Sequence, residues 1–242
     1  MDTWKNNNVL TRFKESYFIE NTDGDRASGL PADAKPVGGT IFYIDGIANG
    51  IYEFFDADGS VIENVRVGDR PHAYRVIKRG SKDKYYVYHD KVYNNARWTY
   101  YKDKNYVYES LGASKDIGYG KTNTEKAMAE DSGAYITRDS NELPTIWYQL
   151  QQARIAKAGG CDDWFIPSLY EIEKLRKAIK SGSITGGAIA GSSYSDSVFS
   201  SKWLWSSSES FSQGAWGWNY IIQAWDYCGK NYDLSVFFIR AF

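Results

Sequence analysis

Residues 203–242 combine many aromatic rings with few charges, and this feature constrains the fold of the chain most. Twelve of these forty residues are Phe, Trp or Tyr, and five are charged. The densest part is GAWGWNYIIQAWDYCGK at 214–230. Tyr and Trp combine a large contact area with a polar group, so they serve protein cores and binding surfaces alike. The chain must either bury these rings or present them as a surface.

The composition of the 242-residue chain fits a globular protein and argues against several functional classes. Hydrophobic residues make up 43% of it, enough for a sizeable core. With 29 basic and 30 acidic residues, the formal net charge of −1 predicts no nucleic-acid partner. No apolar run approaches the ~20 residues of a membrane helix. We therefore expect no membrane insertion, and the N-terminal sequence shows no signal-peptide pattern.

The first half of the chain carries strand patterns. VGGTIFYIDG at 37–46 predicts a strand followed by a turn, and GIYEFFDADGSVI at 50–62 predicts a hairpin that turns at Asp58-Gly59. Tyr-rich runs between residues 72 and 108 alternate with Lys, Asp and Asn. This alternation favours short antiparallel hairpins that are exposed to solvent.

Helix patterns occupy the middle of the chain. NTEKAMAED predicts a helix capped by Asn123 or Thr124, and LPTIWYQLQQARIAKAGG predicts a second helix that begins near Pro144. In the third, PSLYEIEKLRKAIKSG, Ser168 and Glu171 form a capping-box pattern ahead of an apolar stripe.

Strands first, helices in the middle and strands last predict an α+β fold with antiparallel strands and two to three helices. We expect a lead-in segment at 1–36 and one domain at 37–242, with a Tyr-rich β insertion at 60–110. The Ser- and Gly-rich stretch at 181–201 predicts a long flexible loop.

Patterns typical of catalysis or metal binding are weak throughout. Cys161 and Cys228 are too few for a disulfide framework or a zinc site, and the chain has only two His. Cys161 has no base nearby in sequence, so it fits a packed residue better than a nucleophile. The pair Asp162-Asp163 fits a cap or surface charge better than a ligand role. We expect no catalytic residues, no metal site and no cofactor.

The aromatic segment has the composition of a binding surface. Its rings alternate with Gln, Asp, Asn and Gly, whereas a core would be richer in Leu, Val and Ile. Large rings among small polar residues are typical of paratopes. A strand over AWGWNYII would place Trp216, Trp218, Tyr220 and Ile222 on one face. The alternative is a buried strand pair, and we favour surface recognition.

Several motifs occur in an order that resembles a known family. They are GGTIFYID, GKTNTEKAM, GGCDDWFIPSLYEI, WLWSSSES, AW, a lone Lys and VFFIRAF. This succession is similar to the Lcl C-terminal-type domains over about residues 37–242, apart from the Tyr-rich block. The resemblance implies a C-type-lectin fold close to the variant of the formylglycine-generating enzyme.

Domains of this type are common in variable proteins of diversity-generating retroelements, where a mutagenic reverse transcriptase replaces adenines at the 3′ end of a gene. The resemblance implies a fixed framework that displays altered residues on a lectin-fold surface. Phe237 departs from the family, which usually has Arg there, and Cys161 replaces a usual Tyr. The calcium-binding motifs of sugar-binding lectins are missing from the sequence. The framework residues that the resemblance implies are Trp205, Ser206, Ser207, Glu209, Ala215, Trp216, Lys230, Val236, Ile239, Arg240 and Phe242.

We therefore predict a non-enzymatic binding protein whose region 203–242 is diversified to recognise varied targets. The expected partner is a protein, such as a cell-surface or viral receptor, which suggests the cell surface or a virion as its setting. The alternatives are a surface adhesin or a phage or virus receptor-binding protein of fixed specificity and, less favoured, an enzyme of the formylglycine-generating type. The sequence leaves the oligomeric state open. The predicted ligand-binding residues are Phe211, Gln213, Gly214, Gly217, Trp218, Tyr220, Ile222, Ala224, Trp225, Asp226, Tyr227, Asn231, Tyr232 and Asp233.

Overall fold

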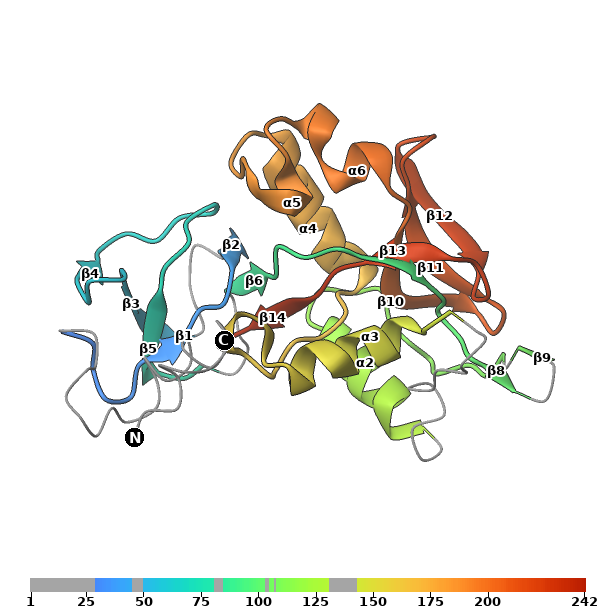
Figure 1. The fold of residues 1–242 in the computed structure, drawn as a ribbon, viewed down its shortest axis with the longest axis horizontal. Coiled ribbons are helices and arrows are strands. Elements are labelled where there is room, and N and C mark those ends of the chain that lie inside the picture. The colour runs from blue at the N-terminus through green and yellow to red at the C-terminus, as the bar shows by residue number, and fades with distance from the viewer. Residues whose placement is uncertain (1–28, 45–49, 81–84, 103–104, 107, 131–142) are drawn as a thin grey trace. The chain divides into compact units, whose positions relative to one another are not determined.

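The computed structural model is a mixed α+β structure of small β-sheets and a few helices, which confirms the predicted class (Figure 1). It describes residues 29–44, 50–80, 85–102, 105–106, 108–130 and 143–242. The described chain forms two compact units. Unit 1 comprises the described residues up to His89 with Ala153–Asp163 and Arg240–Phe242, and unit 2 comprises those of Asp90–Gln152 and Trp164–Ile239.

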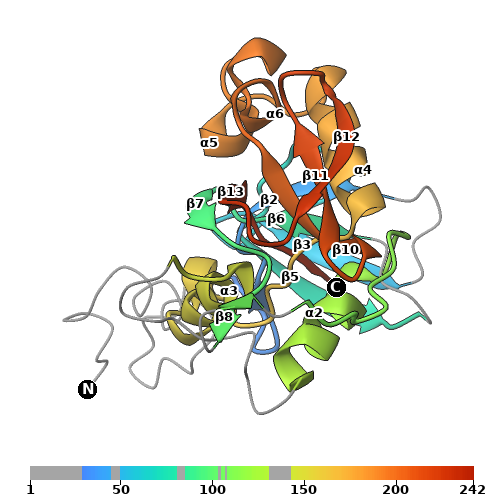
Figure 2. The same cartoon turned by 90° about the vertical axis from the view of Figure 1, so that its right-hand side faces the viewer.

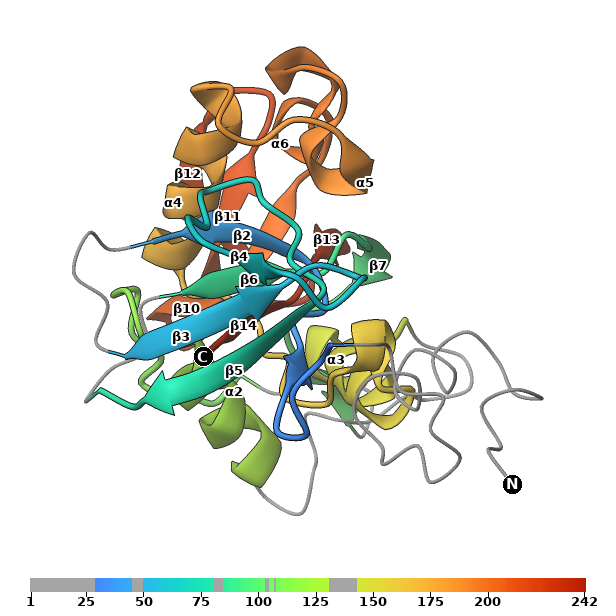
Figure 3. The same cartoon turned by 90° about the vertical axis from the view of Figure 1, so that its left-hand side faces the viewer.

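Unit 1 contains an antiparallel sheet of strand order β1-β5-β3-β4 (Figure 3). These strands are β1 (Lys35–Pro36), β3 (Ile51–Phe55), β4 (Val61–Ile62) and β5 (Ala73–Lys78). The β3–β4 hairpin turns at Asp58-Gly59, as predicted, and Gly59 adopts a φ of 86°. A second sheet has the order β14-β6-β2, with β2 (Thr40–Tyr43), β6 (Tyr86–Tyr88) and β14 (Ile239–Ala241). All three residues of β6 are buried, so the prediction of solvent-exposed hairpins is wrong for this Tyr-rich run.

The C-terminus lies in the core of unit 1. Phe242 stacks on Tyr74 with ring centroids 4.2 Å apart. The buried Arg240 guanidinium donates to the Pro36 carbonyl at 2.6 Å and to Asp163 Oδ2 at 2.9 Å. Its Nη1 also lies 3.1 Å from Cys161 Sγ, whose pKa burial raises to about 12. At neutral pH the buried Cys161 side chain is therefore a protonated thiol. Asp163 forms an ion pair with Arg240.

Unit 2 is built on a five-stranded sheet of order β12-β11-β10-β13-β7 (Figure 2). Strands β10, β11 and β12 form an antiparallel meander, β13 runs parallel to β10, and β7 pairs antiparallel with β13. A separate hairpin is formed by β8 (Tyr101–Lys102) and β9 (Asn105–Tyr106). The strands of the large sheet are β7 (Tyr93–Ala96), β10 (Leu204–Phe211), β11 (Gly214–Asn219), β12 (Ala224–Gly229) and β13 (Leu234–Val236).

Among the described residues, three long helices are α2 (Gly120–Ala129), α3 (Ile146–Ile155) and α4 (Leu169–Lys180), and the short η3 (Ala158–Gly160) follows α3. The capping box of α4 is present: the Ser168 N–H donates to Glu171 Oε2 at 2.8 Å. Helix α2 has Tyr119 as its N-cap, four residues before Asn123 and five before Thr124, the two predicted caps. The side chain of Asn123 does not cap it, because its amide is buried and bonds to both backbone groups of Ser114.

The segment 181–201 is not the flexible loop that its composition predicts. It folds into α5 (Gly187–Ala190), η4 (Tyr194–Asp196) and α6 (Val198–Ser201). Its few large apolar residues, among them Ile184, Ile189 and Phe199, are buried. These anchors stabilise the segment, and the Ser and Gly residues between them supply the turns.

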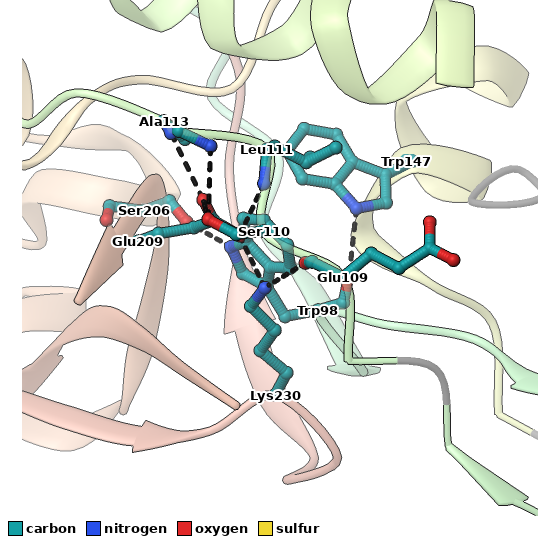
Figure 4. Close-up of polar contacts among 10 residues, drawn as sticks. Trp98, Glu109, Ser110, Leu111, Ala113, Trp147, Ser206, Glu209 and Lys230 are labelled. Atoms are coloured by element: carbon teal, nitrogen blue, oxygen red, sulfur yellow. Dashed lines mark hydrogen bonds and ion pairs between the residues drawn. The ribbon is translucent and has the colours of Figure 1, made fainter. Parts of the chain in front are cut away.

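Much of the tryptophan content belongs to the core of unit 2. Trp98, Trp147, Trp164, Trp205 and Trp218 are all buried. The indole N–H of Trp147 donates to the Trp98 carbonyl at 2.8 Å, and that of Trp98 donates to the Ser206 carbonyl at 2.9 Å (Figure 4). The indole N–H of Trp205 donates to the Ala96 carbonyl at 2.9 Å. These bonds remove the cost of burying an indole N–H, so the rings serve as core residues.

Candidate binding surface

The β11–β12 hairpin carries most of the predicted site, and its turn is built by Asn219. The Asn219 Oδ1 accepts the N–H groups of Ile221 at 3.0 Å and Ile222 at 3.4 Å, the bonding of an Asx turn. Gln223 completes the turn with a φ of 50°. The turn therefore projects Ile221 and Ile222, both exposed, at the tip of the hairpin.

One face of the hairpin carries a row of aromatic rings, which we call the ring face. Trp218 pairs with Trp225, Trp216 with Tyr227, and Gly214 with Gly229. Residues directly opposite each other in an antiparallel pair share a face, as do residues two apart along a strand. The paired rings meet edge to face, with centroids 5.2 Å apart for Trp218–Trp225 and 6.2 Å for Trp216–Tyr227.

Helix α4 closes the end of the ring face nearest the tip. The Trp225 indole N–H donates to Glu173 Oε2 at 2.8 Å, and the Arg176 guanidinium lies 4.9 Å from the Trp218 ring. Burial acts to raise the pKa of Glu173, but hydrogen bonds from Arg176 and Trp225 hold it below its usual value. Trp218 is 1% exposed and donates its indole N–H to the Phe199 carbonyl at 2.6 Å.

The other end of the ring face is open. Phe211 is 49% exposed and Tyr227 57%, and their ring centroids lie 5.5 Å apart. Tyr232 is 60% exposed. Trp216 is half-buried, with the Lys115 ammonium 5.7 Å from its ring centroid. We call Phe211, Trp216, Tyr227 and Tyr232 the open aromatic patch.

Two paired glycines make room for this patch. A Cβ on Gly214 would lie 2.7 Å from the Phe211 ring, and a Cβ on Gly229 would lie 3.1 Å from the Tyr232 ring. Phe211 and Tyr232 therefore rest against the backbone of the Gly214–Gly229 pair. On the ring face, this pair is the next one after Trp216–Tyr227, so the four rings form one continuous area.

The structure divides the predicted ligand-binding residues into three groups. Those exposed to solvent are Phe211, Gln213, Ile222, Tyr227, Tyr232 and Asp233. Those half-buried are Tyr220, Ala224, Trp225, Asp226 and Asn231. Those buried are Gly214, Gly217 and Trp218.

The buried group corrects the prediction for a ligand surface. Trp218 does share a face with Trp216, but α4 and the Phe199 segment cover it. A Cβ on Gly217 would lie 2.9 Å from the carbonyl oxygen of Leu204 on the neighbouring strand. Gly217 therefore permits close strand packing. The predicted alternation also fails at Ile222, because the strand ends at Asn219.

Three residues of the surface were not in the predicted set. The family resemblance places Trp216 in the framework, although its alternation with Trp218 and Tyr220 already indicated the ring face. A strand that runs through AWGWNYII would put Ile221 on the face opposite Ile222, and the Asn219 turn exposes both instead. No sequence signal placed Lys115, which precedes α2, beside Trp216.

A buried polar cluster fixes the hairpin at its open end (Figure 4). Lys230 directly follows β12, and its N–H donates to the Gln213 carbonyl at 3.0 Å. Its ammonium donates to Glu209 and to the Glu109 carbonyl, and it lies 4.3 Å from the Trp98 ring. Burial lowers the pKa of Lys230, and Glu209 partly opposes that shift. The hairpin is thus held on a rigid base.

Cys228 is the cysteine of this surface and lies on β12. Burial, with a contribution from Asp226, raises the pKa of Cys228 to about 11. Its thiol is therefore protonated at neutral pH and is a poor nucleophile. Within the described ranges, no cluster of three or more His, Cys, Asp or Glu side chains could hold a metal ion. No described helix has the length and apolar character of a membrane span.

No protein-family model and no curated protein matches the sequence. A solved structure, a fimbrial protein from Bacteroides ovatus, is similar to the chain with a TM-score of 0.43 and 13% identity. The similarity covers 81% of this chain and 49% of the fimbrial protein, so the chain spans about half the length of that protein.

Proposed function

We propose that this chain is a non-enzymatic binding protein that recognises a protein ligand through the open aromatic patch. The observation that carries the proposal is the contrast between two sets of rings in unit 2. Trp98, Trp205 and Trp218 are buried with their indole N–H groups bonded. Phe211, Tyr227 and Tyr232 stand about half exposed on one side of the same sheet. Exposed rings on a rigid base are typical binding hot spots.

The magnitudes indicate how much of the surface a ligand must cover. Burying the exposed halves of three rings contributes on the order of 2–5 kcal/mol. A micromolar complex needs about 8 kcal/mol. The remainder must come from neighbouring groups, and the β10–β12 meander also exposes Gln213, Ile221 and Ile222. The site in this proposal therefore extends from the patch along the hairpin to its tip.

The ligand class is tested with the labelled chain on arrays of purified extracellular proteins and of glycans. The proposal predicts saturable binding to protein features. Saturable binding to glycan features alone would contradict it.

The proposal includes the lectin-type scaffold and the retroelement origin that the sequence resemblance implies. This part of the proposal is supported by a difference in burial between the framework residues and the predicted ligand-binding residues. Of the eleven framework residues that the resemblance implies, all but Glu209 and Trp216 are buried. Eleven of the fourteen predicted ligand-binding residues are exposed or half-buried. Diversification would then act at the eleven exposed or half-buried ligand-binding positions and spare Gly214, Gly217 and Trp218.

Sibling copies of the gene and the DNA beside it test this part of the proposal. We expect a reverse transcriptase gene, a near-copy of the 3′ end, and adenine-linked differences confined to exposed and half-buried positions. Identical tails in all copies would favour a fixed-specificity adhesin or receptor-binding protein. Differences spread evenly along the gene would overturn diversification and leave the binding role standing.

A further inference from the structure

The two edges of the large sheet in unit 2 differ in how they are protected. At one edge, β7 has only four residues, its register with β13 is irregular, and Asn95 adopts a φ of 55°. At the other edge, β12 has six residues, all in unbroken register with β11 (Figure 2). Exposed edges are normally protected by bulges, Pro or Lys, and β12 contains none of these.

The backbone of β12 presents hydrogen-bonding groups away from the sheet. The Trp216 carbonyl accepts a bond from Ser206 on β10, so the backbone groups of Trp216 point towards β10. Trp216 and its partner on β12 therefore form a non-hydrogen-bonded pair. In such a pair, the backbone N–H and C=O of the β12 residue point away from β11, towards the free edge of the sheet. That partner is Tyr227. Its N–H donates to the neighbouring Asp226 carboxylate at 2.9 Å, a local bond that a pairing strand would replace, and no described strand pairs with this edge.

Exposed apolar residues lie at both ends of this edge. Ile221 and Ile222 precede the strand, and Tyr232 follows it. Antiparallel pairing of two identical strands brings the start of each strand to the end of the other. The isoleucines of one copy would then meet Tyr232 of the second copy, and the reverse contact would form by symmetry.

We propose that β12 pairs with β12 of a second copy of this chain, antiparallel and centred on Tyr227. In this register the two Tyr227 residues exchange backbone hydrogen bonds, and each Trp225 lies opposite Gly229 of the other copy. The Gly229 carbonyl already accepts the Tyr232 N–H, and its second lone pair remains for the new strand.

Charge favours this register over the antiparallel register that is centred on Asp226. Asp226 is the one charged residue of β12. Centring the pair on Tyr227 places each Asp226 opposite a Cys228, whereas centring it on Asp226 would place two like charges opposite each other, which is destabilising. The proposal does not rest on the proposed ligand. The pairing of the two β12 strands would join two hairpins in one continuous sheet and present two open aromatic patches together.

The first experiment measures molar mass by light scattering for the chain, Tyr227→Pro and Tyr227→Thr over a wide range of concentrations. Both variants lose the ring, but only proline also removes the outward N–H, and it spares the bonds to β11. We expect a concentration-dependent dimer for the wild type, and at least tenfold weaker dimerisation of Tyr227→Pro than of Tyr227→Thr. A wild type that stays monomeric, or equal dimerisation of the two variants, would overturn the proposal.

A second experiment is independent of the proline variant. Opposite residues at a non-hydrogen-bonded position are close enough for a disulfide. Oxidised Asp226→Cys should therefore form a dimer in which the introduced thiol of one copy is linked to Cys228 of the other. This dimer should be visible on a non-reducing gel, and Asp226→Ser should not form it. Absence of that link from a dimeric protein would contradict the register.

Discussion

Lys230 and Glu209 form an ion pair that is almost fully withdrawn from solvent, with side chains 0% and 5% exposed. The pair joins the residue after β12 to strand β10. Glu209 also accepts the N–H groups of Leu111 at 3.0 Å and Ala113 at 3.1 Å. One carboxylate therefore fixes the base of the binding hairpin to a segment almost a hundred residues away in sequence.

Breaking this pair should destabilise the protein more than removing both charges. Glu209→Ala leaves the buried ammonium without its counter-ion and the N–H groups of Leu111 and Ala113 without their acceptor, so we expect a loss of about 3–5 kcal/mol in the free energy of unfolding. The double variant Glu209→Gln/Lys230→Met should lose less than the sum of its single variants. Urea denaturation of the wild type, Glu209→Gln, Lys230→Met and the double variant measures this coupling, with Glu209→Ala measured beside them. Strictly additive losses would show that the two groups do not interact.

Trp218 and Tyr227 should separate stability from recognition. Trp218→Ala removes a buried ring and its bond to Phe199, so we expect a loss of about 3–5 kcal/mol in unfolding free energy. Tyr227→Ala truncates an exposed side chain and should change stability by about 0.5 kcal/mol or less. Thermal or urea unfolding compares them. Similar losses for both variants would place Tyr227 in the core and contradict its role in the patch.

Two glycines should respond differently to an added methyl group. In Gly217→Ala the new Cβ meets the Leu204 backbone carbonyl, which cannot move without disturbing strand pairing, so we expect a loss of roughly 1–3 kcal/mol. In Gly214→Ala it meets the exposed Phe211 ring, which can turn away. This variant should keep most of its stability and lose ligand affinity. Unfolding curves and binding assays of the pair test the distinction, and a larger stability loss for Gly214→Ala would reverse it.

Cys161 gives a prediction for alkaline pH. Burial raises the pKa of its thiol from 9.0 to about 12, so the folded protein retains a proton that the unfolded chain releases. Its contribution to stability is complete below pH 9 and should fall by up to about 1.4 kcal/mol per pH unit between pH 9 and about 12. The Cys161→Ser variant should show a shallower decline, measured by urea unfolding at several pH values. Equal slopes would mean that the thiol is accessible.

The parts of the fold that were predictable depend on local chemistry. The capping box at Ser168 and the Asp58-Gly59 turn act within a few residues, so the sequence alone indicated helix α4 and the β3–β4 hairpin. The sequence did not reveal that residues 181–201 fold into short helices, because a few buried residues such as Phe199 outweigh the Ser- and Gly-rich composition. Local patterns do not reveal which distant segments pack together.

The binding surface shows the same limit. Alternation placed Trp216 and Trp218 on one face, but it could not reveal that α4 covers only the end with Trp218. The aromatic segment is therefore both core and surface, and coverage by neighbouring elements separates the two. Lys115 and Glu173, which flank the ring face, come from segments that the pattern of residues 203–242 cannot identify.

The most direct test of the central claim is binding of three matched proteins to the same array of extracellular proteins. They are the wild type, the double variant Phe211→Ser/Tyr227→Ser, and the control Ile77→Ser, which removes an exposed apolar side chain of unit 1. We predict that the wild type and the control bind the same proteins and that the double variant, folded by circular dichroism, loses that binding. Undiminished binding by the double variant would contradict the assignment of the open aromatic patch as the ligand surface.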